Sequence, residues 1–436
     1  MSQRSDRTVI AALTVITGLY LVLFGYFIGA TAMRVPVFDE IFWVLQYIDH
    51  WLTGDYWGYL WIDHNGHRIV WCRLLTIAML QWPGGSVMPF ILFGIVCFVV
   101  MIGGLVLEVM AAPLPPGPRI AIALMVVLLV ATSFSAIDSA TPMFGNFLHS
   151  CVFVVVALIL WEAPGEATRH GTGRRIGALV AGVLAVFGVS GGMLVLPVLV
   201  WIAWRGGFGW RWTLAALAVT VAVPAIYFPT QHALPLVTTF DGPTVLRMAD
   251  YILRFFGLPW SHSPMLVNAG RLIGLATILA SVFVVLRYGV FGRPRNRLDR
   301  IAVGLLLFTF LIAGAITFGR LDAAPEREMP IRYAMFTSLA QVGLLLAAAP
   351  WLCRLWVNLK RPIVQSAMLF AAVLLLVQQV LGGQAGARVV QQYTAAYRAY
   401  ESGNSTWEQD RLMGAPRYAN RALDFIHAHG LFPAEH

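Results

Sequence analysis

Apolar runs, many of them about 20 residues long and so able to cross a bilayer as helices, recur from Val9 to Gly382. Short polar loops separate them. The runs lie at residues 9–32, 69–82, 88–112, 120–135, 148–161, 176–190, 192–204, 213–229, 264–288, 301–319, 333–352 and 363–382. This pattern predicts an all-α polytopic membrane protein with about 11–13 transmembrane helices.

Three stretches outside these runs are long enough to hold structure of their own. In the first, residues 33–68, Phe42, Leu45, Ile48 and Trp51 follow helical spacing among many aromatic residues, which predicts helices lying along the membrane interface. The second covers residues 230–263. In the third, the tail, residues 387–401 and 416–429 resemble two short amphipathic helices. We therefore expect a transmembrane domain over 1–382 and a C-terminal extracytoplasmic helical tail over 383–436.

Composition and charge give the expected orientation. The chain is 59% hydrophobic and 12% charged, against about 25% charged in soluble domains. Its net charge of +9 comes almost wholly from arginine, since Lys360 is the only lysine. The arginines gather in short loops, as in charges kept on the cytoplasmic side, so we expect no nucleic-acid partner. The segments that then face outward from a bacterial inner membrane are the first outer loop (33–68), residues 134–147, residues 230–263, residues 320–332 and the tail after Gly382.

Twelve apolar runs do not fit the expected sides of the two termini. Twelve crossings would return the tail to the side of the basic N-terminus, so one run is expected not to cross. The run 69–82 is the weakest because it is short and carries Arg73; the pair 176–190 and 192–204 is the other candidate. The first run lacks a signal-peptide cleavage site, which favours a retained helix. The four cysteines lie in or beside apolar runs and are expected to be packing residues.

The first outer loop contains the strongest candidates for chemistry. Asp39 and Glu40 directly follow the first run, and His64, Asn65, His67 and Arg68 come later in the same loop. Carboxylates can abstract a proton, and imidazole and guanidinium groups can hold a phosphate. The alternative is that the acids only mark a helix end in water. His64 and His67 would share one face of a helix and could ligate a metal, but Gly66 between them disfavours a helix.

A second concentration of charge surrounds residues 319–333. Arg332 and Tyr333 open a membrane helix, where an arginine needs a partner, and a lipid phosphate bound by the planar guanidinium is a natural one. Arg320 lies at the other end of this segment. The alternative is a solvated loop whose charges pair with each other. His262 could contribute from the same side.

The order of these elements resembles the GT-C class of membrane glycosyltransferases, whose first outer loop carries an acidic pair after the first helix. More narrowly, HNGHRI at 64–69, FGR at 318–320 followed by IRYAMFTSL at 331–339, and FIHAHGLF at 425–432 resemble a group of bacterial multi-spanning proteins of GT-C type. Gly66 stands where that group often has Glu, and Ile331 where it often has Ser.

The resemblance implies an inverting transferase. Its donor would be a polyprenyl-phosphate monosaccharide, and its acceptor an envelope glycan, lipid or protein. Asp39, or else Glu40, would be the general base. Residues implied to bind the donor phosphate are Arg320, Arg332, Tyr333, Arg68 and His67, and those implied to bind substrate are His64, Asn65 and His262. No cofactor is required, although a divalent cation has room in such a mechanism.

Three other functions compete with this interpretation. A transporter or flippase of a lipid-linked or anionic substrate would also explain the membrane helices and arginines, but such proteins often contain internal repeats, and no repeat is evident here. A non-catalytic scaffold in envelope synthesis is a second alternative. An O-antigen polymerase or ligase is a third, although its usual large late outer loop is replaced here by about a dozen residues around Pro325.

Overall fold

A computed structural model describes residues 2–33, 36, 39–161, 171–229, 240–260, 267–294, 296–321, 330–358, 361–404, 406 and 416–432. Within these residues the protein is helical and forms no β-sheet, as predicted. Seven helices are long and apolar enough to span a membrane. The protein is therefore an all-α polytopic membrane protein.

The helices of the first half are α1 (Ser2–Thr31), α2 (Asp39–Gln46), η1 (Tyr47–Trp51), α3 (Tyr56–Trp61), α4 (Val70–Gln81), α5 (Met88–Ala111), α6 (Pro116–Val130), α7 (Ser133–Ala140), α8 (Pro142–Leu160), α9 (Gly171–Val186), η3 (Ser190–Leu194) and α10 (Val195–Gly206). Those of the second half are α11 (Trp210–Tyr227), α12 (Gly242–Gly257), η4 (Leu258–Trp260), α13 (Val267–Val285), η6 (Leu286–Val290), α14 (Arg297–Arg320), η7 (Ile331–Tyr333), α15 (Ala334–Val357), α16 (Arg361–Glu401) and α18 (Pro416–Ala428).

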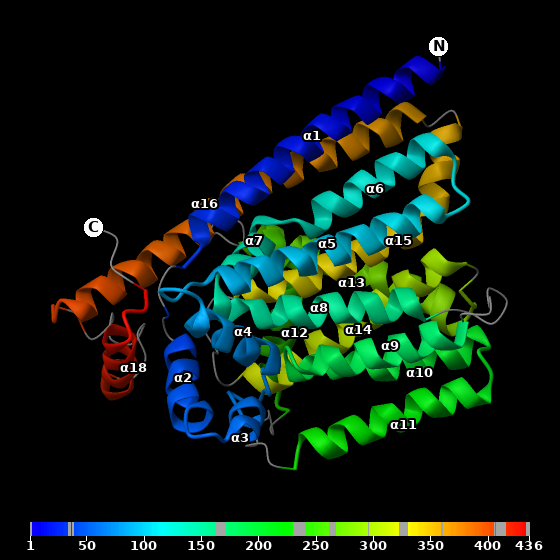
Figure 1. The fold of residues 1–436 in the computed structure, drawn as a ribbon. Coiled ribbons are helices and arrows are strands. Elements are labelled where there is room, and N and C mark those ends of the chain that lie inside the picture. Colours follow the sequence, from blue (N-terminus) through cyan, green and yellow to red (C-terminus); the bar gives the residue numbers. More distant parts are fainter. Residues whose placement is uncertain are drawn as a thin grey trace.

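The long helices lie roughly side by side. Helices α1 and α16 run together along one edge of the bundle, and α11 forms the opposite edge (Figure 1). Helices α14 and α15 are the most buried of the spanning helices. The outer helices expose apolar side chains such as Val22 on α1, Leu107 on α5 and Leu272 on α13. Exposed apolar surface of this extent suits contact with lipid.

The two ends of the bundle differ in charge. At one end, called the basic end here, lie the N-terminus and the turns α5–α6, α10–α11, α13–α14 and α15–α16 (Figure 1). Its arginines include Arg119, Arg175, Arg205, Arg211, Arg297, Arg354 and Arg361. Ion pairs tie this end together, among them Arg297 with Glu108 (Nε–Oε2 2.5 Å) and Arg361 with Asp6. The opposite end, called the distal end here, carries α2, α3, α4 and α18 (Figure 1).

Helix α4 corresponds to the apolar run 69–82, the run that we expect not to cross. It has 12 residues, which is about 18 Å of helix against roughly 30 Å of hydrocarbon. Near its start Trp71 N–H donates to Phe187 O, and near its end Ser86 N–H donates to Met79 O; both places lie at the distal end. Arg73 is fully buried there, not in lipid, and donates to Ile62 O (3.2 Å). That 69–82 does not span the membrane stays a prediction, which the short helix and the buried arginine support.

Apart from α4, further helices shorter than the seven candidate spans connect the two ends of the bundle. The shorter helices α6, α8, α9 and α10 also run between the two ends, beside the long helices (Figure 1). The N-terminus lies at the basic end and the tail at the distal end. This is the arrangement that the charge pattern requires.

Two elements differ from the sequence expectations. Helix α16 runs unbroken through the expected domain boundary at residue 382 to Glu401, so the separate helix expected over 387–401 is wrong. Polar residues lower the hydropathy after Gly382, but none of them breaks the helix. The short buried helix α7 was not expected, whereas the expected helix over 416–429 is present as α18.

The first outer loop and the tail cover the distal end together. The helical spacing of the loop produces α2 and η1, as predicted. Helix α18 packs on α2. It also contacts η1, where Arg421 pairs with Asp49 (2.5 Å) and the ring of Phe425 lies 6.2 Å from that of Tyr47. Asp55 caps α3, and its hydrogen bond with His50 lowers the pKa of its carboxyl. These contacts hold the loop in a defined position over the bundle.

Candidate functional site

The segment from His64 to His67 is a tight two-residue turn. The backbone N–H groups of His64 and His67 each donate to the other residue's carbonyl, at 2.8 and 2.9 Å. Asn65 and Gly66 have φ angles of +51° and +77°, as at the two central positions of a type I′ turn, where Asn-Gly is the preferred pair. The helical arrangement that would have aligned two histidine ligands does not form. In the described chain, no group of three or more candidate metal ligands lies together.

The turn brings His64 to the start of α2. Nε2 of His64 lies 3.5 Å from Oδ1 of Asp39 and 3.3 Å from Nδ2 of Asn65. A protonated Nε2 can donate to the carboxylate, whereas an unprotonated one can accept from the amide. The ring of Trp43 packs against the imidazole at 5.9 Å. The structure brings together three of the candidate residues of the first outer loop, Asp39, His64 and Asn65.

The side chains of the adjacent acids Asp39 and Glu40 differ in their exposure to solvent. The side chain of Asp39 is 25% exposed, whereas Glu40 is fully buried. A carboxylate must be reached by a substrate hydroxyl to take its proton. Of the two, Asp39 is the one that can act as a base on an incoming molecule.

Arg332 lies at the centre of the site's charges. Its guanidinium lies 5.8 Å from the ring of Phe147 and 5.6 Å from that of Tyr333. It also interacts electrostatically with Asp138 on α7 and with Tyr393 on α16. Tyr393 in turn interacts with Asp39 and Glu40. The charges of the first-loop acids and of the late arginine thus both act on Tyr393.

Asp138 is a site residue that the sequence analysis missed. It is 1% exposed, and neither carboxyl oxygen has a hydrogen-bond partner within the described residues. Burial raises the pKa of the Asp138 carboxyl well above its ordinary value, and the charge of Arg332 opposes that shift. The available signal was a single acid in the otherwise uncharged stretch between two apolar runs.

A cavity of about 300 Å³ lies beside these groups. Its polar lining comes from His67, Ser190 and Tyr333, and its apolar lining includes Phe147, Ile312 and Phe336. Nδ1 of His67 lies 2.7 Å from Ser190 Oγ and accepts from the Ser190 backbone N–H at 3.4 Å. Because that N–H can only donate, the proton of a neutral His67 ring lies on Nε2. His67 and Tyr333, both predicted site residues, therefore meet on one cavity.

Arg68 is placed for structure and not for ligand binding. It is 1% exposed, and its side chain donates to the carbonyls of Tyr227 (3.1 Å) and Trp61. The guanidinium also lies 4.7 Å from the Trp61 ring. The guanidinium thus contacts Trp61 in the first loop and Tyr227 at the end of α11, and Arg68 joins these two elements. The geometry argues against the predicted phosphate contact.

Two predicted residues cannot be placed. Arg320 ends α14, but its side chain is not among the described groups. His262 lies outside the described residues.

Fold and site together define a polytopic membrane protein with a charged, partly enclosed site at one end of its helices. No family model matches the chain, and neither a curated protein nor a solved structure matches it. The case for a function therefore rests on the residues of the site.

Proposed function

We propose that the protein is an inverting glycosyltransferase that moves a monosaccharide from a polyprenyl-phosphate donor to an envelope acceptor. The observation that carries the proposal is the position of Asp39, a partly exposed carboxylate beside His64. It shares the electrostatic environment of Tyr393 with the guanidinium of Arg332. A base and a cation for a leaving phosphate are the two groups that such a transfer needs.

The proposed step is a single displacement. The Asp39 carboxylate takes the proton of an acceptor hydroxyl, whose oxygen forms a bond to the anomeric carbon. The bond from that carbon to the donor phosphate oxygen breaks, and its electron pair leaves with the polyprenyl phosphate. Arg332 stabilises the charge that develops on this phosphate. One base suffices for inversion, unlike the paired carboxylates of glycoside hydrolysis.

The cavity beside Arg332 suits the donor's sugar. Its polar edge of His67, Ser190 and Tyr333 can hydrogen-bond hydroxyls, and its rings can pack on a sugar face. Its volume of about 300 Å³ lies at the lower end of the range of small-molecule pockets. This size favours a single monosaccharide over a longer glycan.

The location also supports a lipid-linked substrate. The site groups lie at the distal end, where the spanning helices stop, so a polyprenyl chain could stay in the bilayer while its phosphate reaches Arg332. Basic loops are kept in the cytoplasm, so the distal end would face the periplasm of a bacterial inner membrane.

The test is to incubate purified protein with a panel of radiolabelled polyprenyl-phosphate monosaccharides and envelope extract. We expect release of polyprenyl phosphate and movement of label into a new product, and arms with chelator or added Mg²⁺ measure any need for a divalent cation. If no donor of the panel is consumed while labelled lipid crosses proteoliposome membranes, the protein is a flippase and the proposal is wrong.

A further inference from the structure

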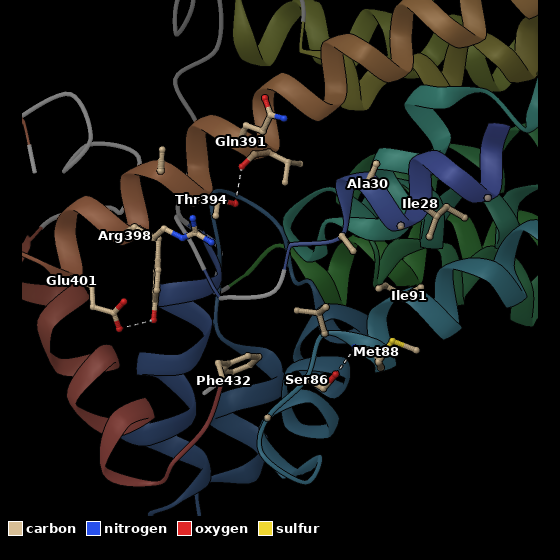
Figure 2. A pocket seen from close by; sticks show the side chains of 18 residues that line it. Ile28, Ala30, Ser86, Met88, Ile91, Gln391, Thr394, Arg398, Glu401 and Phe432 are labelled. Atoms are coloured by element: carbon tan, nitrogen blue, oxygen red, sulfur yellow. Dashed lines mark hydrogen bonds between the residues drawn. The ribbon is translucent and has the colours of Figure 1, made fainter. Parts of the chain in front are cut away.

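A second and larger hollow opens near the site. A groove of about 1230 Å³ runs between the end of α1, the start of α5 and the part of α16 beyond Gly382 (Figure 2). This is larger than most pockets for small molecules, which span roughly 300–1,000 Å³. Phe432 of the tail lines one side, and its N–H donates to Gly84 O, which fixes the tail against the turn before α5.

The groove wall on α1 and α5 is apolar and flat. Ile28, Met88 and Ile91 line it, together with Gly25 and Gly29. A Cβ added at either glycine would meet no atom within 4 Å, so the absence of these side chains creates open space on a helix that faces lipid. Such a wall fits an acyl chain entering sideways from the bilayer.

The α16 wall of the groove is polar and carries a positive charge. Gln391, Thr394 and Arg398 line it, and the guanidinium of Arg398 extends from α16 into the hollow (Figure 2). No described residue forms an ion pair or hydrogen bond with this guanidinium. The neighbouring Glu401 is engaged by His427 at 2.9 Å. The groove therefore offers an available arginine to an anion, and a phosphate is the group that arginine recognises best.

The groove adjoins the site through α16. Val390 and Thr394 line the groove, and Tyr393, in the same turn of the helix, interacts with Asp39 and Arg332. The 300 Å³ cavity lies on the Phe147 and Tyr333 side of Arg332. Arg332 thus lies beside two rings that line the cavity, and the charges of Asp39 and Arg332 act on Tyr393, the neighbour of Thr394 in the groove wall.

We propose that the groove binds the acceptor, and that this acceptor is an anionic phospholipid with a hydroxyl on its headgroup. This inference rests on the proposed function. The acyl chain lies along the glycine wall of α1, the lipid phosphate binds Arg398, and the headgroup hydroxyl reaches Asp39. That hydroxyl gives its proton to Asp39, and its oxygen takes the sugar as polyprenyl phosphate departs.

The binding test compares phosphatidylglycerol with phosphatidylcholine on delipidated protein by native mass spectrometry. Gly29→Leu fills the groove, whereas Gly18→Leu is its matched control, because Gly18 is equally open on α1 but does not line the groove. We expect wild type and Gly18→Leu to bind phosphatidylglycerol alike and Gly29→Leu to bind at least about tenfold more weakly. Arg398→Gln should lose about tenfold in preference for the anionic lipid. Equal binding by both leucine variants would overturn the proposal.

The transfer test adds labelled donor to the same proteins in phosphatidylglycerol nanodiscs. We expect label to enter the phospholipid with wild type and Gly18→Leu, and this product to fall at least tenfold with Gly29→Leu. Equal labelling by both leucine variants would overturn the acceptor assignment while leaving the transferase intact. If wild type binds the lipid as expected but consumes no donor of the panel, the proposed function fails, and the acceptor role fails with it.

Discussion

The Asp39 carboxylate lies 3.5 Å from Nε2 of His64, which joins the start of the first outer loop to the turn near the loop's end. This pairing depends on the fold of the whole loop, because α2, η1 and α3 intervene between the two residues. A base and its orienting partner within such reach are a recurring feature of catalytic sites. The contact therefore makes the first loop a compact unit with a defined reactive group.

The turn that carries His64 should be sensitive to its glycine. Gly66→Ala places a Cβ at a φ of +77°, which should cost about 1–2 kcal/mol of stability. Asn65→Gly should be close to neutral because glycine also adopts positive φ. Thermal unfolding in detergent measures both variants. Equal melting temperatures for Gly66→Ala and wild type would contradict the turn geometry.

Arg68 should prove to be a stability residue. Arg68→Met leaves the carbonyls of Trp61 and Tyr227 without this donor, at about 1–3 kcal/mol for each buried group left unsatisfied. Arg388→Met is the control, since Arg388 is exposed on α16 and should change stability by less than about 0.5 kcal/mol. Comparable melting temperatures for the two variants would restore Arg68 as a ligand-binding candidate.

The buried Asp138 should make the stability of the folded protein fall as pH rises. Because burial raises its pKa, the folded protein holds this proton more tightly than the unfolded chain does. The stability that the neutral carboxyl contributes is present at low pH and is lost as pH rises from about 4, the unfolded value, through the raised folded value. Asp138→Asn should remove this loss. Melting temperatures measured from pH 4.5 to 7.5 should converge at low pH and diverge above it, whereas parallel curves would show that Asp138 is not buried.

The proposed transfer should depend on the planar shape of the Arg332 guanidinium as well as on its charge. Arg332→Lys keeps the charge but loses the planar pair of donors that suits a phosphate, so we expect kcat/KM for the lipid-phosphate donor to fall about tenfold. Arg332→Gln should fall further, by about 10²–10³, as on removal of one stabilising donor. Donor-consumption assays, with unfolding curves as the control for folding, test this. Full activity in Arg332→Gln would remove the residue from the site.

The sequence predicts features that depend on neighbouring residues better than features that depend on tertiary contacts. Hydropathy locates the long apolar helices because lipid contact selects apolar residues locally, and it predicts that the run around Arg73 does not cross. It misplaces the end of α16, since helix formation continues through polar residues after Gly382. The joint influence of the Asp39 and Arg332 charges on Tyr393 and the burial of Asp138 are tertiary effects. Only the resemblance to a family suggested the first. For the second, the sequence analysis did not use the one available signal, a single acid between two apolar runs.

The most direct test of the account is single-turnover release of polyprenyl phosphate by wild type, Asp39→Asn and Glu40→Gln, each with a normal unfolding curve. If Asp39 is the base, its loss should slow release by about 10²–10⁴-fold. Glu40→Gln should stay much closer to wild type, because Glu40 is fully buried and does not reach the acceptor. Wild-type rates in Asp39→Asn would contradict the account.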